Sequence, residues 1–255
     1  MNDRFDYPTY RELLARIGAT HRIIAFADVG PRNPPEPFCI LRHDVDYSTT
    51  AAVRLASSEA DQGIRATYFL MVGSEYYNLL SPQDSHVART LTGLGHEVGL
   101  HYDVNTFLPF PRSEWLRLLH SQAALLSDLA GAPVQSIAMH QPALNGADPF
   151  ADEPLPYLNA YAPRFTRDAV YVSDSCRAWR DDGWTMFAAS RFPPHLQLCL
   201  HPINWDDADR DRVDIFRSLH SGAAQRMVQR GERLLEQIAR HSGVLEHEAR
   251  RARQR

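Results

Sequence analysis

The sequence predicts an α/β fold built around a parallel β-sheet. Apolar segments rich in β-branched and aromatic residues alternate along the chain with segments of helical spacing. Helices between successive strands are typical of βα units, in which the connected strands run parallel. At 255 residues the chain also has the length at which a single α/β barrel domain is common.

The first half of the chain supplies three expected strands. Leu13, Leu14 and Ile17 repeat at helical spacing and the pattern stops at Gly18, as a helix with a glycine end does. A proline-rich loop, PRNPPEP, then leads into the first strand. The expected elements of this half are, in order, a helix over residues 9–18, the strand PFCIL, a helix over residues 49–62, the strand IRATYFLMV, a helix from Ser81 to Gly93 and the strand HEVGLH.

The second half continues the alternation and ends in a helical tail. Its expected elements are a helix over residues 113–130, the strand SIAMHQP, a long loop with one short element over residues 142–167, the strands AVYVSDS and LQLCLHP, and a helical tail over residues 212–255. In the tail, Leu234, Leu235, Ile238 and Ala239 lie on one side. We therefore expect a single barrel domain over residues 1–255, with the helical tail starting at about residue 208.

Charge and composition argue against several classes of function. The net charge of −4 and the pI near 6.3 give no general attraction to phosphate backbones, so nucleic acid is not favoured as a partner. All 27 basic residues are arginine. The absence of lysine excludes a Schiff-base lysine and a phosphate-loop lysine, because a guanidinium cannot replace either.

Cysteine usage and the N-terminal residues predict a reducing, cytoplasmic location. Cys39, Cys176 and Cys199 are odd in number and widely spaced, which is typical of buried free thiols and not of a disulfide framework or a zinc ribbon. The first residues, MNDRFDYPTYRELL, lack the apolar segment of a secretory signal. No apolar run is long enough to predict a membrane span.

Two carboxylates end the first expected strand. In the motif LRHDVDYS, Asp44 and Asp46 are two residues apart, so they share one face of the strand. Each negative charge raises the free energy of ionising the other. A cation between them removes this conflict, because one aspartate can bind the cation while the other accepts a proton from an attacking water.

Ionisable side chains also follow the apolar runs of the later strands. With the two aspartates, the set is Asp44, Asp46, His101, His140, Asp174 and His201. Taken singly, each is explained as a hydrogen-bonded residue at a strand end or as a cap. In a parallel barrel the strand ends meet at one mouth, so we expect all six in one pocket. Carboxylates and imidazoles without paired cysteines suit a divalent metal ion, with zinc expected and cobalt, nickel or manganese as alternatives.

The order of these motifs resembles that of a known family. RHDVDYS, GHEVGLHYD, HQP, YVSDSCRAW and LCLHP are similar to the motifs of the polysaccharide deacetylase family, the family 4 carbohydrate esterases. The likeness is greatest to the HDVD-bearing branch linked to bacterial surface-polysaccharide biosynthesis, and it covers roughly residues 10–205. The resemblance implies a distorted (β/α)7 barrel and metal-dependent hydrolysis of an N-acetyl group on a sugar, with release of acetate.

The resemblance also implies a metal site that departs from the family pattern at one position. Asp44 matches the catalytic base, and Asp46 and His101 match metal ligands. The second histidine of the family's metal pair is replaced by Asn105, a weak ligand. His140 is therefore the candidate third ligand, with the alternative that it only orients Asp44.

The remaining motifs imply the groups that finish the reaction. His201 matches the histidine that protonates the leaving amine, and Asp174 matches the residue that orients it. Trp179 resembles a wall of the acetyl pocket. Tyr77 and Tyr102 are expected to contact the sugar, with the alternative that loop aromatics anchor the barrel rim. A backbone N–H near residue 143 is the expected oxyanion donor.

Two other functions are compatible with the same residues. The loss of a histidine at Asn105 allows a metal-poor barrel that binds carbohydrate without catalysis. A metal amidohydrolase or deformylase acting on a non-sugar amide is the other, because a fold does not fix its chemistry. A cytoplasmic location favours a nucleotide-linked or lipid-linked sugar over a finished wall polymer as the substrate.

Overall fold

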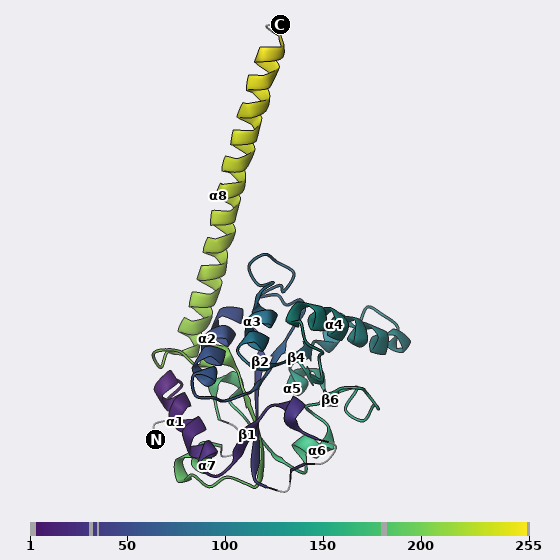
Figure 1. The fold of residues 1–255 in the computed structure, drawn as a ribbon, viewed down its shortest axis with the longest axis vertical. Helices are drawn as coiled ribbons and strands as arrows, with labels where there is room; N and C mark the ends of the chain where they lie inside the picture. The colour runs from purple at the N-terminus through teal and green to yellow at the C-terminus, as the bar shows by residue number, and fades with distance from the viewer. Residues whose placement is uncertain (1–3, 31–32, 35, 180–182, 254–255) are drawn as a thin grey trace. The chain divides into compact units, whose positions relative to one another are not determined.

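The computed structural model describes residues 4–30, 33–34, 36–179 and 183–253. The chain divides into two compact units, Met1–Arg210 and Asp211–Arg255. The first unit carries the sheet and the helices that cover it (Figure 1). The second unit is one long helix, α8, Arg212–Arg253.

The first unit is built on a parallel sheet. The strands are β1 Arg22–Ile24, β2 Phe38–Val45, β3 Thr67–Leu70, β4 Glu97–Tyr102, β5 Ser136–Met139, β6 Leu158–Asn159, β7 Val170–Ser173 and β8 His195–Leu200. Seven of them follow the order β6-β5-β4-β3-β2-β8-β7, and β1 pairs with β2. Within the described residues no pairing joins β6 to β7, so the curled sheet stays open there, as expected of a distorted (β/α)7 barrel. The predicted α/β fold class is confirmed.

Helices connect the strands and cover the outside of the sheet. They are α1 Tyr7–Gly18, α2 Thr49–Ala60, α3 Val87–Gly93, α4 Trp115–Ala130, α5 Pro142–Asn145, α6 Pro163–Thr166 and α7 Gly183–Ala189, with short 3-10 turns at Phe26–Asp28, Val104–Thr106, Arg112–Glu114, Ser175–Arg177 and Pro202–Asn204. Side-chain caps start two of them: Asp6 accepts from Thr9 N in α1, and Ser48 accepts from Ala51 N in α2. Helices α2, α3 and α4 lie side by side (Figure 1).

Three local expectations were wrong. Strand β1 was not predicted, because three residues are too few to show an alternating pattern. The third helix begins at Val87 and not at Ser81, since Asp84 instead accepts hydrogen bonds from Thr49 Oγ1 and Ser81 Oγ and closes a loop there. The segment 142–167 contains α5, β6 and α6, three short elements where one was expected.

Strand β2 separates two cores by the alternation of its side chains. Phe38 and Ile40 belong to the small apolar cluster inside the barrel, whereas Leu41 and Val45 belong to the large cluster under the helices. Arg42 and Asp44 have the same parity as Phe38 and Ile40. The strand therefore directs both polar groups to the inside, above an apolar floor.

Within the described residues, no helix combines the length and the apolar composition that crossing a membrane requires.

Candidate active site

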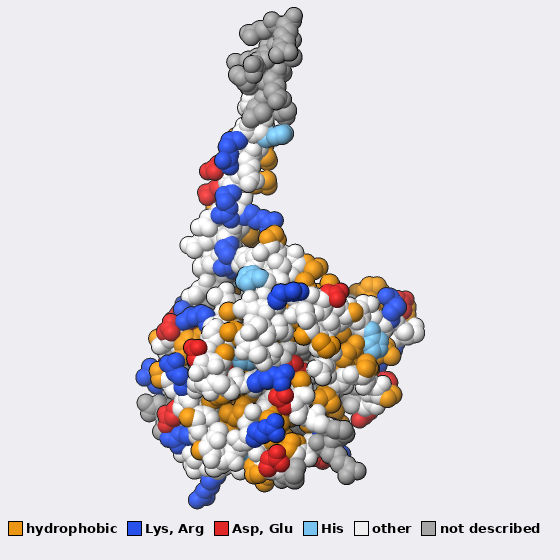
Figure 2. All heavy atoms as spheres, in the orientation of Figure 1, with side chains coloured by type: hydrophobic (Ala, Val, Ile, Leu, Met, Phe, Trp, Pro, Cys, Tyr) orange, Lys and Arg blue, Asp and Glu red, His pale blue; other side chains and the backbone are white. Residues whose placement is uncertain are grey.

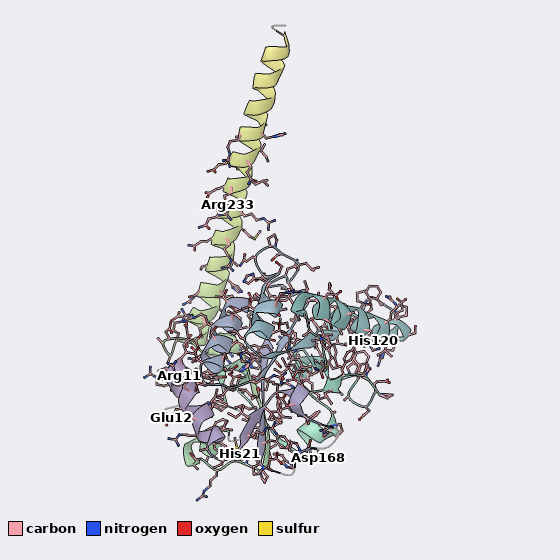
Figure 3. All side chains as sticks on the ribbon, viewed as in Figure 1. Arg11, Glu12, His21, His120, Asp168 and Arg233 are labelled. Atoms are coloured by element: carbon pink, nitrogen blue, oxygen red, sulfur yellow. The ribbon has the colours of Figure 1, made fainter. Side chains whose placement is uncertain are left out.

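The predicted ionisable residues meet at the carboxyl edge of the sheet. Asp44 lies in β2 and His101 in β4, while Asp46, His140, Asp174 and His201 follow the ends of β2, β5, β7 and β8. Because these strands are parallel, their ends share one edge. Other histidines lie elsewhere: His120 on α4 contacts Tyr157 and His21 contacts the carbonyl of Pro193 (Figure 3).

Three of these residues form a compact triangle of ligand atoms. Asp46 Oδ1 lies 3.1 Å from His101 Nε2 and 3.2 Å from His140 Nδ1. The two ring nitrogens are 3.1 Å apart. Asp46 and His101 are almost fully enclosed, and the ring of His140 is slightly more open. The structure thus brings His140 together with Asp46 and His101.

The tautomer of the neutral His101 ring is set by the strand beside it. Its Nδ1 lies 3.0 Å from the carbonyl oxygen of Ala138 in β5, an acceptor only, so Nδ1 carries the hydrogen. In the neutral ring the lone pair is then on Nε2, which faces the triangle. A backbone carbonyl in this place is the usual partner that holds a metal-binding histidine in one tautomer.

The position of His140 is fixed by the backbone around it. Its main-chain N–H donates to the carbonyl of Tyr102 at 2.8 Å, and Asn145 Nδ2 donates to its carbonyl at 3.2 Å. The next residue, Gln141, has a left-handed φ of 49°, a conformation that costs a non-glycine residue on the order of 1 kcal/mol. The chain turns sharply here, immediately after the ring has been placed.

The triangle fits a divalent cation. A tetrahedral ion with ligands at roughly 2.0–2.1 Å separates neighbouring ligand atoms by about 3.3 Å, close to the three observed spacings. A cation also resolves a shortage of hydrogens, because a carboxylate oxygen and the bare nitrogen of His101 are both acceptors. In the described residues, Asp46, His101 and His140 are one of two groups of acids, histidines and cysteines whose ligand atoms all lie within 4.8 Å of one another; the other is Asp44, Cys199 and His201.

Asp44 is held beside the triangle by an arginine that sequence reasoning missed. Arg42 Nη2 donates to Asp44 Oδ2 at 2.9 Å, and the thiol of Cys199 lies 3.4 Å from the same oxygen. Burial acts to raise the pKa of Asp44, but Arg42, His101 and His201 outweigh it, so the pKa is lowered. Asp44 Oδ1 is buried without a hydrogen-bond partner in the described residues. Asp44 is therefore a carboxylate with one uncommitted oxygen.

Arg42 is itself fully buried, and both of its terminal nitrogens are engaged. It also donates to Gln197 Oε1 at 3.1 Å and to Tyr161 Oη at 2.7 Å. Its guanidinium carbon lies 4.7 Å from the ring centre of Tyr161. Its place two residues before Asp44, on the same strand face, was the signal in the sequence.

His201 is positioned by Asp174 and Trp205. Asp174 Oδ1 lies 2.6 Å from His201 Nδ1 and accepts from the main-chain N–H of His201 at 3.0 Å. The other oxygen of Asp174 accepts from Trp205 Nε1 at 2.9 Å. Burial acts to lower the pKa of His201, but Asp174, Asp46 and Asp44 raise it to about 9. Its Nε2 lies 3.9 Å from Asp46 Oδ2.

Asn105 lies outside the triangle. Its side-chain nitrogen donates to Asp103 Oδ1 at 2.9 Å and to Asn145 Oδ1 at 3.2 Å. Since Asn145 also holds the carbonyl of His140, Asn105 joins the loop after β4 to the turn that carries that histidine.

The two tyrosines expected to contact the sugar are both buried in this structure. Tyr77 is buried, and its hydroxyl donates to the carbonyl of Val45 and accepts from Met71 N. Tyr102 is also buried, and its hydroxyl donates to Asp148. Both hydroxyls are thus hydrogen-bonded inside the protein.

Other aromatic groups remain near the site. Trp179 is partly buried, with its ring 6.2 Å from that of Trp205. Burial and the charge of Asp46 raise the pKa of Tyr47 to about 12. Its ring packs edge-on against that of the exposed Tyr76, 4.8 Å away. Tyr47 directly follows Asp46, and that adjacency was its signal in the sequence.

Comparison with known proteins gives structural matches only. No protein-family model matches the sequence, and neither does any curated protein. A polysaccharide deacetylase from Bacillus cereus matches with a TM-score of 0.44 and 14% identity, over 74% of this chain and 88% of that one. A family 4 carbohydrate esterase from Bacillus anthracis matches with a TM-score of 0.38 and 13% identity, over 84% and 86%. A family 4 pseudoenzyme from the same species gives 0.43 and 13%, over 78% of this chain and 66% of that one.

Proposed function

We propose that the protein hydrolyses the N-acetyl group of a sugar, releasing acetate and a free amine. The observation that carries the proposal is the triangle of Asp46, His101 and His140 with a carboxylate oxygen of Asp44 and a ring nitrogen of His201 beside it. These are the groups that metal-assisted amide hydrolysis needs: ligands, a base and an acid. A barrel that only binds carbohydrate has no need of the last two.

Asp46, His101 and His140 would hold the cation. When bound there, a divalent ion polarises an amide carbonyl and lowers the pKa of a water molecule. Zinc is the ion we propose, because two imidazoles and one carboxylate leave a fourth position open, as in catalytic zinc sites.

Asp44 would act as the general base. Arg42 holds the carboxylate ionised and engages Oδ2, which leaves Oδ1 to accept the proton of the attacking water. Ala143, in the first turn of α5, is the backbone N–H that we propose as a donor to the oxyanion. Burial of Arg42 and Asp44 keeps bulk water from weakening this pair.

His201 would act as the general acid. Asp174 keeps the ring protonated and fixes its direction, so Nε2 can donate to the nitrogen of the departing sugar amine. The base and the acid then lie on β2 and after β8, two strands that pair directly. Atoms balance: water adds to the acetyl carbon, the C–N bond breaks, and the amine takes the proton.

The direct test is a screen for acetate release from N-acetylated nucleotide sugars and oligosaccharides, with and without added Zn²⁺. Non-sugar acetamides and formamides belong in the same screen, because turnover of these alone would assign a different amidohydrolase. Asp44→Asn should lower turnover about 1,000-fold and keep the bound metal. Asp46→Asn and His101→Asn should lose both, whereas His120→Asn, a remote imidazole, should lose neither. Equal metal retention in all these variants would refute the roles.

A further inference from the structure

Helix α8 exposes apolar side chains along much of its described length. Every residue from 225 to 243 is exposed. Five large apolar side chains in this stretch leave more than half of their surface open, and they are Met227, Val228, Leu234, Leu235 and Ile238. In Figure 2 hydrophobic side chains gather along one edge of this helix. Helices of globular proteins are stabilised mainly by packing of such a face, so this face calls for a partner.

The exposed apolar residues form one continuous stripe. At 3.6 residues per turn, the five side chains, together with Ala224 and Gly231, fall within about 120° of the helix circumference. They repeat as positions a, d and e of a heptad, with Gly231 at an a position in the middle. A Cβ atom at Gly231 would have nothing within 4 Å, so the helix surface is open at this point.

Charges of opposite sign border the two sides of the stripe. Glu232 lies on one border and Arg230 on the other, whereas Glu236 shares its heptad position with Gln229 on the polar face. Arg226, Arg233 and Arg240 occupy the polar face away from the stripe (Arg233 is labelled in Figure 3). The acidic border and the basic border are therefore complementary to each other.

We infer that α8 pairs with α8 of a second copy of this chain, in parallel and in register. A parallel pair has its two-fold axis along the helices, so the basic border of one helix meets the acidic border of the other. Arg230 then lies about 3 Å along the axis from Glu232 of the second copy, twice in each dimer. An antiparallel pair centred on Gly231 instead places Glu232 against Glu232. The charge pattern thus selects both the partner and the direction.

This inference goes beyond the proposed function and does not depend on it. The described stripe spans 224–238, about two heptads, so we expect a dimer that dissociates on dilution. Leu234→Glu in the full chain should weaken dimerisation about 100-fold or more, whereas Gln229→Glu, on the polar face, should not. Light scattering after gel filtration over a concentration series measures this. A wild-type chain that stays monomeric at the highest concentration overturns the inference.

An engineered disulfide tests whether the two α8 helices run parallel or antiparallel. In a Cys176→Ser background, Ile238→Cys places two thiols side by side across a parallel axis, so mild oxidation should link the chains. In an antiparallel pair centred on Gly231 the same thiols would be about 21 Å apart. Arg233→Cys, on the polar face, is the control and should not link. Linking of both variants equally, or of neither, contradicts the parallel pair.

A separate experiment tests whether the charged borders of the stripe select the parallel pair. Arg230→Glu should weaken the dimer about fivefold, and adding Glu232→Arg should restore it, because only the parallel pair joins the two borders. No restoration in the double variant overturns the charge argument. Binding of the monomer to anionic lipid vesicles, lost in Leu234→Glu and without any dimer, would assign the stripe to a membrane surface instead.

Discussion

The two faces of strand β2 each have a buried carboxylate among histidines, and we propose a functional site on only one of them. On the outer face, Glu59 of α2 lies 2.7 Å from His43 Nε2 and accepts from the hydroxyl of Tyr68 at 2.7 Å. The hydroxyl of Tyr10 donates to it as well. Both oxygens of Glu59 thus have donors, and the group is fully enclosed.

On the inner face, the neutral tautomer of His101 points a lone pair at Asp46. The triangle around Asp46 includes the bare Nε2 of His101, and the neighbouring Asp44 Oδ1 has no partner in the described residues. An unsatisfied buried acceptor costs free energy, and a cation or a water proton removes that cost. Acids and histidines alone therefore do not mark a functional site. What marks a functional site is a set of lone pairs that point at one another and have no hydrogen to share.

The largest effect on stability is expected at Glu59, on the outer face. Glu59→Gln removes a charge that His43, Tyr10 and Tyr68 enclose, and breaking such a buried network costs about 3 kcal/mol. Denaturant unfolding measures the loss. Zinc binding per folded molecule should stay as in the wild type, and loss of zinc binding in this variant would contradict the division between the two faces.

A smaller effect, on turnover, is expected at Asp174, which positions the proposed general acid His201. Asp174→Asn should lower acetate release about 100-fold, or about 2.7 kcal/mol, because His201 loses the partner that fixes its direction and charge. KM should change little and zinc content should not change. A fall in zinc content equal to the fall in turnover would show that Asp174 acts through the triangle.

Low pH should reduce the stabilisation that the charge of Glu59 gives to the outer face of β2. Burial acts to raise the pKa of Glu59, but His43, His96 and Tyr10 outweigh it, so the folded-state pKa lies below the unfolded one. The stabilisation is present above the unfolded pKa and disappears as pH falls through the folded pKa. The difference in unfolding free energy between wild type and Glu59→Gln should therefore shrink from pH 7 toward pH 3. A constant difference would contradict an ionised Glu59.

The smallest effect is expected at Asn105. Its side chain lies on the loop and not in the triangle, so Asn105→Ala should change zinc affinity by less than about threefold. Titration with zinc measures this. A loss of tenfold or more would make Asn105 a ligand and would require the site to be redrawn.

The meeting of the ionisable residues was predictable because a parallel sheet brings the ends of its strands to one edge. The alternation of apolar and helical segments predicted the sheet, and the sheet brings Asp46, His101 and His140 together although they are far apart in the chain. Which tyrosine of SEYYN faces outward was not predictable. Tyr77 turns inward because Val45 and Met71 offer it hydrogen bonds, and Tyr76 is left exposed.

Arg42 shows a second limit of prediction from the sequence. The buried Arg42 needs an acid from its own strand, a glutamine from β8 and an aromatic ring from the turn after β6, and a single sequence does not reveal that these meet. The short strand β1 is a third case, because pairing with β2 defines it and its own pattern does not.

The most direct test of the account is a calorimetric titration of metal-stripped protein with Zn²⁺. We expect one ion per chain in the wild type and in Glu59→Gln, and no stoichiometric binding in His140→Ala, since His140 supplies one corner of the triangle. Absence of binding in the wild type, or unchanged binding in His140→Ala, would contradict the claim that the inner face of β2 is a metal site.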